Sequence, residues 1–173
     1  MRSYRHHFHA GNHADVLKHL VLMLLLEHLG QKEAPFWYID THAGAGRYTL
    51  PPADSRAEWT NGIGRLWDSP RLSADLMRFV ERVENADPQG HRRCYPGSPT
   101  WARMLCRAQD RLRLFEWHPT DHRALASAAD FRADPRIRIF SADGLAGLKG
   151  LLPPPPRRAV VLLDPPYEDA SEY

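Results

Sequence analysis

The chain has 173 residues, of which 43% are hydrophobic, and carries a formal net charge of +2. This length predicts one domain with a single core, and the mildly basic balance suits an anionic partner. Two cysteines exclude a disulfide framework, and we expect no signal peptide. The apolar run Leu20 to Leu26 is far shorter than the roughly 20 residues that span a bilayer. We therefore expect a cytoplasmic protein that makes no membrane contact.

The first eleven residues are rich in arginine, histidine and aromatic side chains, among them Tyr4. This composition suits a nucleic-acid contact, although a solvated N-terminus has a similar composition. His9 and His13 are four residues apart, as two metal ligands on a helix would be. No cysteine pair or second histidine cluster completes a ligand set, so we predict that no metal is bound.

A helix is predicted next, with Asn12 as its N-cap, Asp15 in its first turn and Gly30 as its C′ stop. Its second half is apolar nearly all round, which predicts a buried helix. His19 lies in the polar first half, where a lone histidine is most simply solvated or capping.

Residues 36–40 predict the first strand, which continues into Thr41-His42-Ala43-Gly44-Ala45-Gly46-Arg47. Gly44 and Gly46 would let the backbone approach a ligand closely. A pair of glycines alone is weak evidence, because glycine turns are common. The third glycine of the dinucleotide fingerprint is absent, which argues against NAD.

Residues 48–110 are too long for a minimal strand–helix–strand unit, and we predict a helical insertion between the first and second strands. Its helical pieces are residues 64–67, 73–85 and 100–109, separated by breaks that contain proline and glycine. The turn Pro96-Gly97-Ser98-Pro99 precedes the last of them. On the sequence alone, Ser98 is expected to be the N-cap of that helix rather than a ligand contact.

Strands and helices then alternate. Residues 112–118 and 137–144 predict the second and third strands, with helices at 121–131 and 145–152. Residues 159–163 predict a fourth strand that is buried on both faces. This alternation predicts an α/β fold with a right-handed parallel sheet.

Each predicted strand ends in an acidic residue, namely Asp40, Glu116, Asp143 or Asp164. An acid after the second strand is placed to accept both hydroxyls of a ribose, and one after the third strand could accept from an adenine amine. These positions favour S-adenosyl-L-methionine over NAD, because the NAD fingerprint expects its acid about 20 residues after the glycines.

The fourth strand ends in Asp164-Pro165-Pro166-Tyr167, a stiff turn because neither proline has an N–H. The Asp164 carboxylate and the Pro165 carbonyl could accept the two N–H bonds of an exocyclic base amine, and Tyr167 could stack on the base. Asp164 would then accept the proton released by methyl transfer. Such a pocket requires a flipped or unpaired nucleotide.

These motifs resemble the ribosomal RNA large subunit methyltransferase J family over the whole chain, most specifically in residues 3–19, 40–48, 95–99, 142–144 and 164–167. The resemblance implies a Rossmann-like class I methyltransferase that methylates N6 of an adenine in 23S rRNA, acting as a monomer on free or partly assembled rRNA, without a metal. It implies that the cofactor pocket is lined by His19, His42, Ser98, Glu116, Asp143, Gly144 and Asp164, with Asp164 as the catalytic acceptor, and that Tyr4 contacts the RNA.

Members of that family continue beyond the fourth strand, so we expect residues 1–173 to form a methyltransferase domain without its C-terminal strands. The alternatives are a guanine-N2 methyltransferase acting on rRNA, a DNA adenine-N6 methyltransferase, and an inactive RNA-binding module of the same fold. An NAD oxidoreductase is the most distant alternative.

Overall fold

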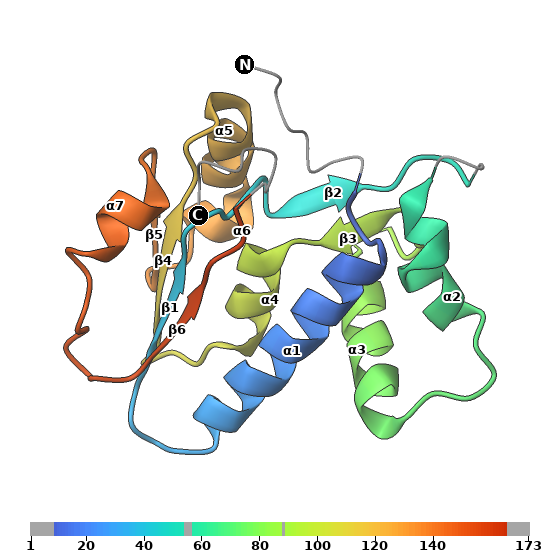
Figure 1. Ribbon diagram of the computed structural model, residues 1–173, viewed down its shortest axis with the longest axis horizontal. Coiled ribbons are helices and arrows are strands. Elements are labelled where there is room, and N and C mark those ends of the chain that lie inside the picture. The colour runs from blue at the N-terminus through green and yellow to red at the C-terminus, as the bar shows by residue number, and fades with distance from the viewer. Residues whose placement is uncertain (1–8, 54–56, 88, 166–173) are drawn as a thin grey trace.

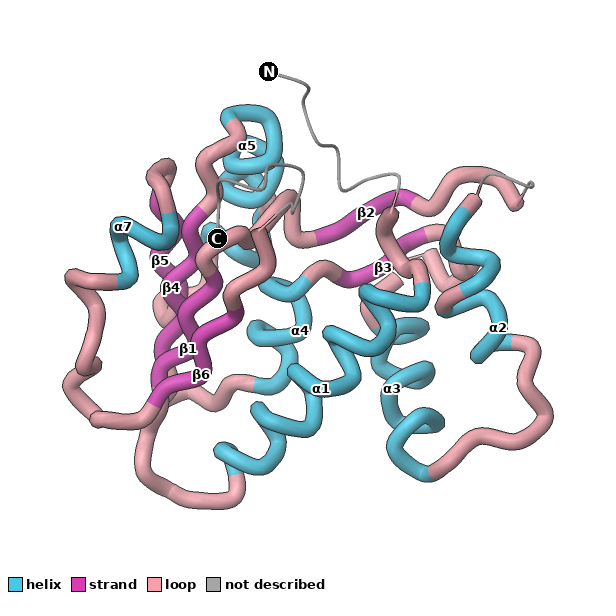
Figure 2. The backbone as a smooth tube through the Cα atoms, viewed as in Figure 1, coloured by secondary structure: helices cyan, strands magenta, loops and turns pink. Residues whose placement is uncertain are grey.

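A computed structural model describes residues 9–53, 57–87 and 89–165. Figure 1 shows a parallel sheet at one side of the molecule and a group of helices at the other. Figure 2 shows the strands of this sheet side by side, with α7 and α1 on opposite sides of them. The predicted α/β architecture is confirmed.

The main sheet has the strand order β5–β4–β1–β6, and all neighbouring strands are parallel. In this register Asp40, the last residue of β1, lies opposite Leu114 of β4 and Leu162 of β6. The carboxyl ends of the strands therefore meet at one edge of the sheet, where open α/β sheets bind ligands. The strands are β1 (Trp37–Asp40), β4 (Arg111–Phe115), β5 (Ile137–Phe140) and β6 (Ala159–Leu162).

The first helix, α1 (His13–Gly30), begins as predicted, because the side chain of Asn12 accepts a hydrogen bond from the backbone N–H of Asp15. Its predicted end is two residues too early, since Gly30 was predicted at C′ but is still helical, and Gln31 is the C-cap. The prediction that its second half is buried all round is wrong. Val21, Leu24 and Leu25 are exposed, because the helix turns its other face, with Leu22, Met23 and Leu26, into the core.

The segment between β1 and β4 contains the predicted helices but also two strands that were not predicted. The strands β2 (Arg47–Thr49) and β3 (Cys94–Pro96) pair antiparallel in a separate small sheet. The helical elements are η2 (Glu58–Asn61), α2 (Ile63–Trp67), α3 (Ala74–Asn85) and α4 (Ser98–Leu105). Helix α4 packs on α1, β1 and β4, so the last part of the segment belongs to the layer that covers the sheet.

After β4 the chain forms α5 (Pro119–Ser127) and α6 (Ala129–Arg132), where one helix was predicted. Helix α7 (Gly144–Leu148) is shorter than predicted and packs on β4. The prediction that β6 is buried on both faces is wrong, since all four of its residues are only half-buried. Within the described ranges β6 pairs with β1 alone and forms an edge of the sheet.

The core lies between the sheet and the layer formed by α1 and α4. The ring of Trp101 in α4 stacks on Phe79 of α3 with centroids 4.8 Å apart, which joins the helical segment to the same core. The largest fully buried side chains include Trp101, Tyr38, Tyr95, Phe36, Phe79, Met23 and Leu26.

Candidate functional site

The loop after β1 carries the two predicted glycines in the left-handed region of backbone space. Gly44 has φ +64° and Gly46 has φ +80°, which favour glycine. A Cβ on Gly44 would also lie 2.0 Å from the hydroxyl oxygen of Tyr48. The glycines therefore let the loop fold back tightly beside the ends of β1 and β4.

Glu116 follows β4 and faces this loop. Its Oε2 accepts a hydrogen bond from the N–H of Gly44 at 2.7 Å, and its Oε1 accepts one from the N–H of His118 at 2.7 Å. Burial raises the pKa of the Glu116 carboxyl, and these two N–H groups only partly offset that effect. The acid predicted after the second strand and the glycine loop are thus in direct contact.

Asp40 is completely buried at the carboxyl end of β1 and organises the centre of the site. Its Oδ2 accepts hydrogen bonds from the hydroxyls of Tyr38 (2.7 Å) and Ser98 (2.6 Å), and its Oδ1 accepts from the N–H of His42 (3.2 Å). Burial raises the pKa of Asp40 despite these three donors. The prediction of Ser98 as an N-cap is wrong, because Gly97 is the N-cap and Ser98 is the first residue of α4.

His42 is tied to the strand that leads to Asp164. Its Nδ1 lies 2.8 Å from Oγ1 of Thr41, and that hydroxyl donates a hydrogen bond to the carbonyl oxygen of Leu162 at 3.1 Å. The N–H of Thr41 donates to the same carbonyl oxygen at 3.1 Å. The ends of β1 and β6 are therefore held together at the base of the loop that carries Asp164.

Asp164 is bound by a cation that the sequence did not assign to the site. The ammonium of Lys18 in α1 lies 2.7 Å from Oδ2 of Asp164 and 2.7 Å from Oδ1 of Asp15. Burial alone would lower the pKa of Lys18, but the two carboxylates outweigh burial and raise it. Lys18 is therefore charged and fixes one oxygen of the predicted catalytic carboxylate.

His19, the next residue, is buried rather than solvated or capping. Its Nδ1 lies 3.0 Å from the hydroxyl oxygen of Tyr95, and its ring stacks on Trp101 with centroids 6.2 Å apart. The turn of α1 that holds His19 is thus anchored in the core, which also fixes the position of Lys18.

Asp143 and Gly144 begin α7 at the same edge of the sheet. Oδ1 of Asp143 accepts hydrogen bonds from the N–H groups of Leu145 (2.8 Å) and Ala146 (3.2 Å), so Asp143 is the N-cap of α7. A Cβ on Gly144 would lie 2.2 Å from the carbonyl oxygen of Thr41. Gly144 is therefore required for the close approach of α7 to the end of β1.

Pro165 is half-buried next to Asp164. Tyr4 and Tyr167, the other two predicted RNA contacts, lie outside the described residues.

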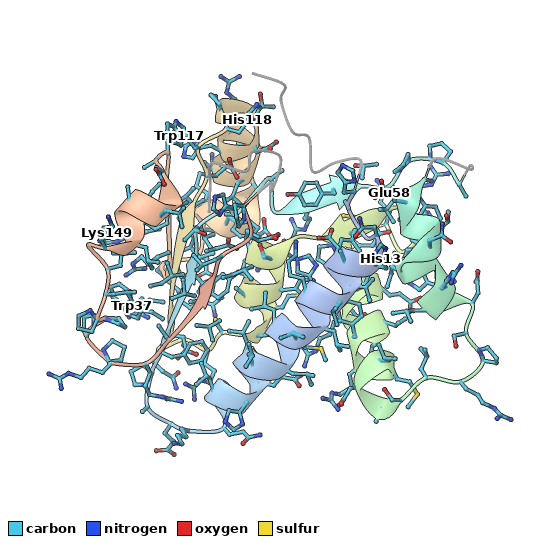
Figure 3. The ribbon with its side chains drawn as sticks, in the orientation of Figure 1. His13, Trp37, Glu58, Trp117, His118 and Lys149 are labelled. Carbon is cyan, nitrogen blue, oxygen red and sulfur yellow. The ribbon has the colours of Figure 1, made fainter. Side chains whose placement is uncertain are left out.

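Two side chains close to these residues in space or in sequence were not assigned a role by sequence reasoning. The sequence gives no local signal for the role of Lys18, because its partner Asp164 is 146 residues away. Trp117 directly follows Glu116 and its side chain is 70% exposed, unusual for so large an apolar side chain. Figure 3 shows Trp117 and His118 at the end of the molecule beyond the strands, whereas Trp37 lies lower, at the start of β1.

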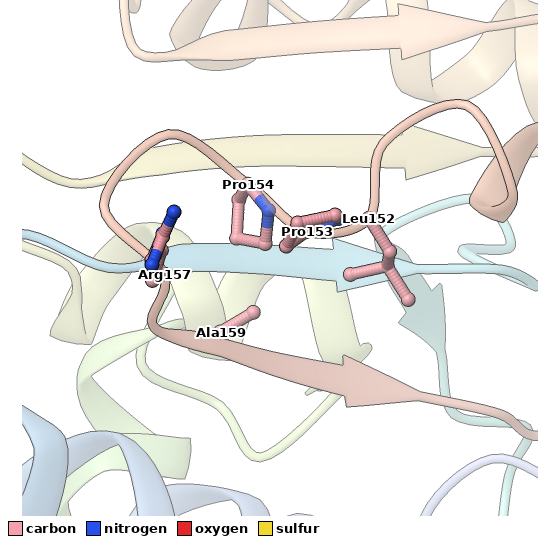
Figure 4. A pocket seen from close by; sticks show the side chains of 5 residues that line it. All are labelled: Leu152, Pro153, Pro154, Arg157 and Ala159. Atoms are coloured by element: carbon pink, nitrogen blue, oxygen red, sulfur yellow. The ribbon is translucent and has the colours of Figure 1, made fainter.

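A pocket of about 520 Å³ lies elsewhere, at the start of β6 rather than at its end. It is lined by Leu152, Pro153, Pro154, Arg157 and Ala159 (Figure 4). In the part of the chain that the structure describes, no three His, Cys, Asp or Glu side chains are grouped to hold a metal ion. No described helix is long and apolar enough to cross a membrane.

The parallel sheet, the glycine loop after its first strand and the acids at its carboxyl edge define a Rossmann-like methyltransferase fold. Residues 33–173 match the family described as Ribosomal RNA large subunit methyltransferase D, RlmJ. The chain belongs to this family.

Its relatives include proteins named Ribosomal RNA large subunit methyltransferase J from two bacteria. The chain is 50% identical to that of Escherichia coli (strain K12) over 175 residues, and 47% identical to that of Haemophilus influenzae over 176 residues. Both alignments cover 100% of this chain but only 62% of the relative. A crystal structure of a protein from Legionella pneumophila str. Philadelphia 1 is similar with a TM-score of 0.85 and 36% identity, covering 95% of this chain and 60% of that one.

Proposed function

We propose that this chain forms the cofactor-binding and base-orienting part of an S-adenosyl-L-methionine-dependent methyltransferase that acts on the N6 amine of an adenine in 23S rRNA. The observation that carries the proposal is the Asp164 carboxylate at the end of β6, fixed at one oxygen by Lys18 at 2.7 Å. The family of the chain supports the reaction class.

The residues at the edge of the sheet fit an adenosine cofactor. Glu116 is a partly buried carboxylate beside a glycine loop, which suits a ribose diol, and its contact with Gly44 keeps it in place. The exposed ring of Trp117 offers a face on which the adenine would stack. We assign the remaining contacts to Gly46, Asp143 and Gly144 around the adenosine, and to His19, His42 and Ser98 near the amino-acid end.

S-adenosyl-L-methionine supplies a methyl group on a sulfonium that needs no further activation. The task of the protein is therefore orientation of the amine. Lys18 occupies Oδ2 of Asp164, which directs Oδ1 toward one N–H of the base, while the Pro165 carbonyl would accept the other. Both bonds favour a pyramidal nitrogen whose lone pair points at the methyl carbon.

The methyl group moves from the sulfur of the cofactor to N6 of the adenine. The lone pair of N6 forms the new N–C bond, the S–C bond breaks, and its electron pair returns to sulfur. The nitrogen then carries one positive charge, which is removed when Asp164 accepts a proton. The ammonium of Lys18, 2.7 Å from Oδ2, holds this carboxylate in place during the transfer.

We propose that the substrate is unpaired adenine in free or partly assembled rRNA, because a base inside a duplex cannot present its N6 amine to Asp164. Together with Pro165, the side chains of Tyr4 and Tyr167 are the proposed contacts to the RNA. We further propose that the protein acts as a monomer.

The test is incubation of the chain with S-adenosyl-L-methionine and protein-free 23S rRNA, followed by mass analysis of nucleosides. We expect N6-methyladenosine from the wild type, none from Asp164→Asn, and a normal yield from the exposed control Asp68→Asn. N2-methylguanosine would favour the guanine alternative, and methylation of DNA alone would favour the DNA alternative. Binding of RNA without any methylated nucleoside, also when the experiment is repeated with a chain of the relatives' length, would favour the inactive module.

A further inference from the structure

The contacts of Thr41 determine which ring nitrogen of His42 carries its proton. A threonine hydroxyl has one hydrogen to donate and lone pairs with which to accept. Oγ1 of Thr41 donates to the carbonyl oxygen of Leu162 at 3.1 Å, and a carbonyl oxygen can only accept. Toward His42, therefore, Oγ1 of Thr41 must be the acceptor.

The 2.8 Å contact between Oγ1 of Thr41 and Nδ1 of His42 is then an N–H···O hydrogen bond donated by the imidazole. In neutral imidazole only one nitrogen is protonated, so Nε2 of His42 carries a lone pair. Within the described ranges, no residue is hydrogen-bonded to this Nε2. Thr41 is 2% exposed, which keeps water from competing for its hydroxyl.

We propose that Thr41 is a positioning residue that holds His42 in the tautomer protonated at Nδ1, so that Nε2 accepts a hydrogen bond from the ammonium of the cofactor's amino-acid end. The neighbourhood favours a cationic donor, because His42 adjoins the buried Asp40 carboxylate, whose Oδ1 accepts from the N–H of His42. The assignment of the ligand rests on the proposed function, whereas the assignment of the tautomer does not.

The same hydroxyl also couples the tautomer to the geometry of the reaction loop. Leu162 is two residues before Asp164, and its carbonyl receives both the N–H and the hydroxyl of Thr41. A shift of β6 against β1 would break the hydroxyl bond and release the constraint on His42. Thr41 thus joins His42, the proposed acceptor of the ammonium, to the strand that leads to Asp164.

The first measurement is the tautomer itself, read from ¹⁵N chemical shifts and long-range ¹H–¹⁵N couplings of the histidines at about pH 8, where an unperturbed imidazole is neutral. The His42 signals are assigned by their loss in His42→Gln. We expect Nδ1–H in the wild type and in Thr41→Ser, and loss of this preference in Thr41→Val, which keeps the shape but has no hydroxyl. Nε2–H in the wild type would overturn the proposal whether or not the protein binds a cofactor.

The second measurement is calorimetric titration with S-adenosylhomocysteine and with 5′-methylthioadenosine, which lacks the amino-acid end. We expect Thr41→Val to weaken the binding of S-adenosylhomocysteine by about 10- to 100-fold, the loss expected for a hydrogen bond to a charged group. Thr41→Ser should restore the affinity, and 5′-methylthioadenosine should bind all three proteins equally. If Thr41→Val lowers the affinity for both ligands equally, or for neither, the assignment of His42 to the ammonium is overturned. Failure of the wild type to bind either ligand would instead count against the proposed function.

Discussion

Removal of the Lys18 ammonium should expose how strongly α1 is coupled to the reaction loop. In Lys18→Met the side chain keeps an unbranched apolar stem of nearly the same length, but the carboxylates of Asp15 and Asp164 lose the cation that lies 2.7 Å from each. Asp15 is the more costly of the two to leave unpaired, because its side chain is 4% exposed, against 32% for Asp164. Asp15 retains the hydrogen bond that it accepts from the N–H of Gly11.

The magnitude follows from these exposures. Breaking a buried ion pair costs about 3–5 kcal/mol, whereas an exposed pair contributes about 0.2–1 kcal/mol. The Lys18 side chain is 20% exposed, so both of its pairs lie between these limits. We expect Lys18→Met to lower the free energy of unfolding by about 3 kcal/mol, with coupling energies of about 2 kcal/mol to Asp15 and about 1 kcal/mol to Asp164.

The assay is urea denaturation of wild type, the single variants Lys18→Met, Asp15→Asn and Asp164→Asn, and the two double variants that contain Lys18→Met. The control is Lys149→Met, because Lys149 is exposed and should change stability by no more than about 0.5 kcal/mol. The reasoning is refuted if Lys18→Met costs no more than the control, or if the coupling to Asp164 exceeds the coupling to the more buried Asp15.

Three other outcomes are expected. Burial raises the pKa of Asp40 above its ordinary value of 3.8, so its contribution to stability is complete below that value and is lost as the pH rises through the folded pKa. In urea titrations the stability of wild type relative to Asp40→Asn should therefore fall as the pH rises above 3.8, and a constant or rising difference would contradict this. Gly62→Ala should destabilise the protein by about 1–3 kcal/mol, because its Cβ would lie 2.1 Å from the carbonyl oxygen of Gly11. Gly30→Ala is the control: its Cβ meets no atom within 4 Å, so it should stabilise the protein by up to about 1 kcal/mol, and equal thermal midpoints of the two variants would count against the close approach. Trp117→Ala should weaken the binding of S-adenosylhomocysteine by about 10-fold, as expected for a lost stacking contact, and Trp117→Phe should retain most of the affinity. An unchanged affinity of Trp117→Ala in calorimetric titration would show that Trp117 does not contact the cofactor.

Local signals in the sequence predicted well where several helices, strands and loops of the sheet layer begin and end. The N-cap at Asn12, the apolar run that became β6 and the glycines after β1 act within a few residues, so their effects can be recognised without the rest of the chain. The same signals failed at α1, where an almost continuous apolar run predicted burial on all sides. Burial depends on which surfaces the other elements cover, and α4 covers one face of that helix.

The small antiparallel sheet shows a second limit. β2 and β3 have three residues each, and Tyr48 pairs with Tyr95 across 46 intervening residues. Strands of this length have too little periodicity to be recognised, because their stability depends on a distant partner. Ser98 illustrates the same effect at the scale of one side chain. Its local context indicates a helix cap, but a buried carboxylate 58 residues away accepts its hydroxyl hydrogen.

The sequence by itself determined the alternation of strands and helices, the left-handed glycine loop and an acid at or shortly after the end of each strand of the main sheet. These follow from backbone sterics and short-range patterns, which each segment carries on its own. Only the tertiary structure decided that β1 lies between β4 and β6, that Lys18 holds Asp164, and that Thr41 joins His42 to Leu162. Those contacts depend on which distant surfaces meet when the core forms, and this is a property of the whole chain rather than of any segment.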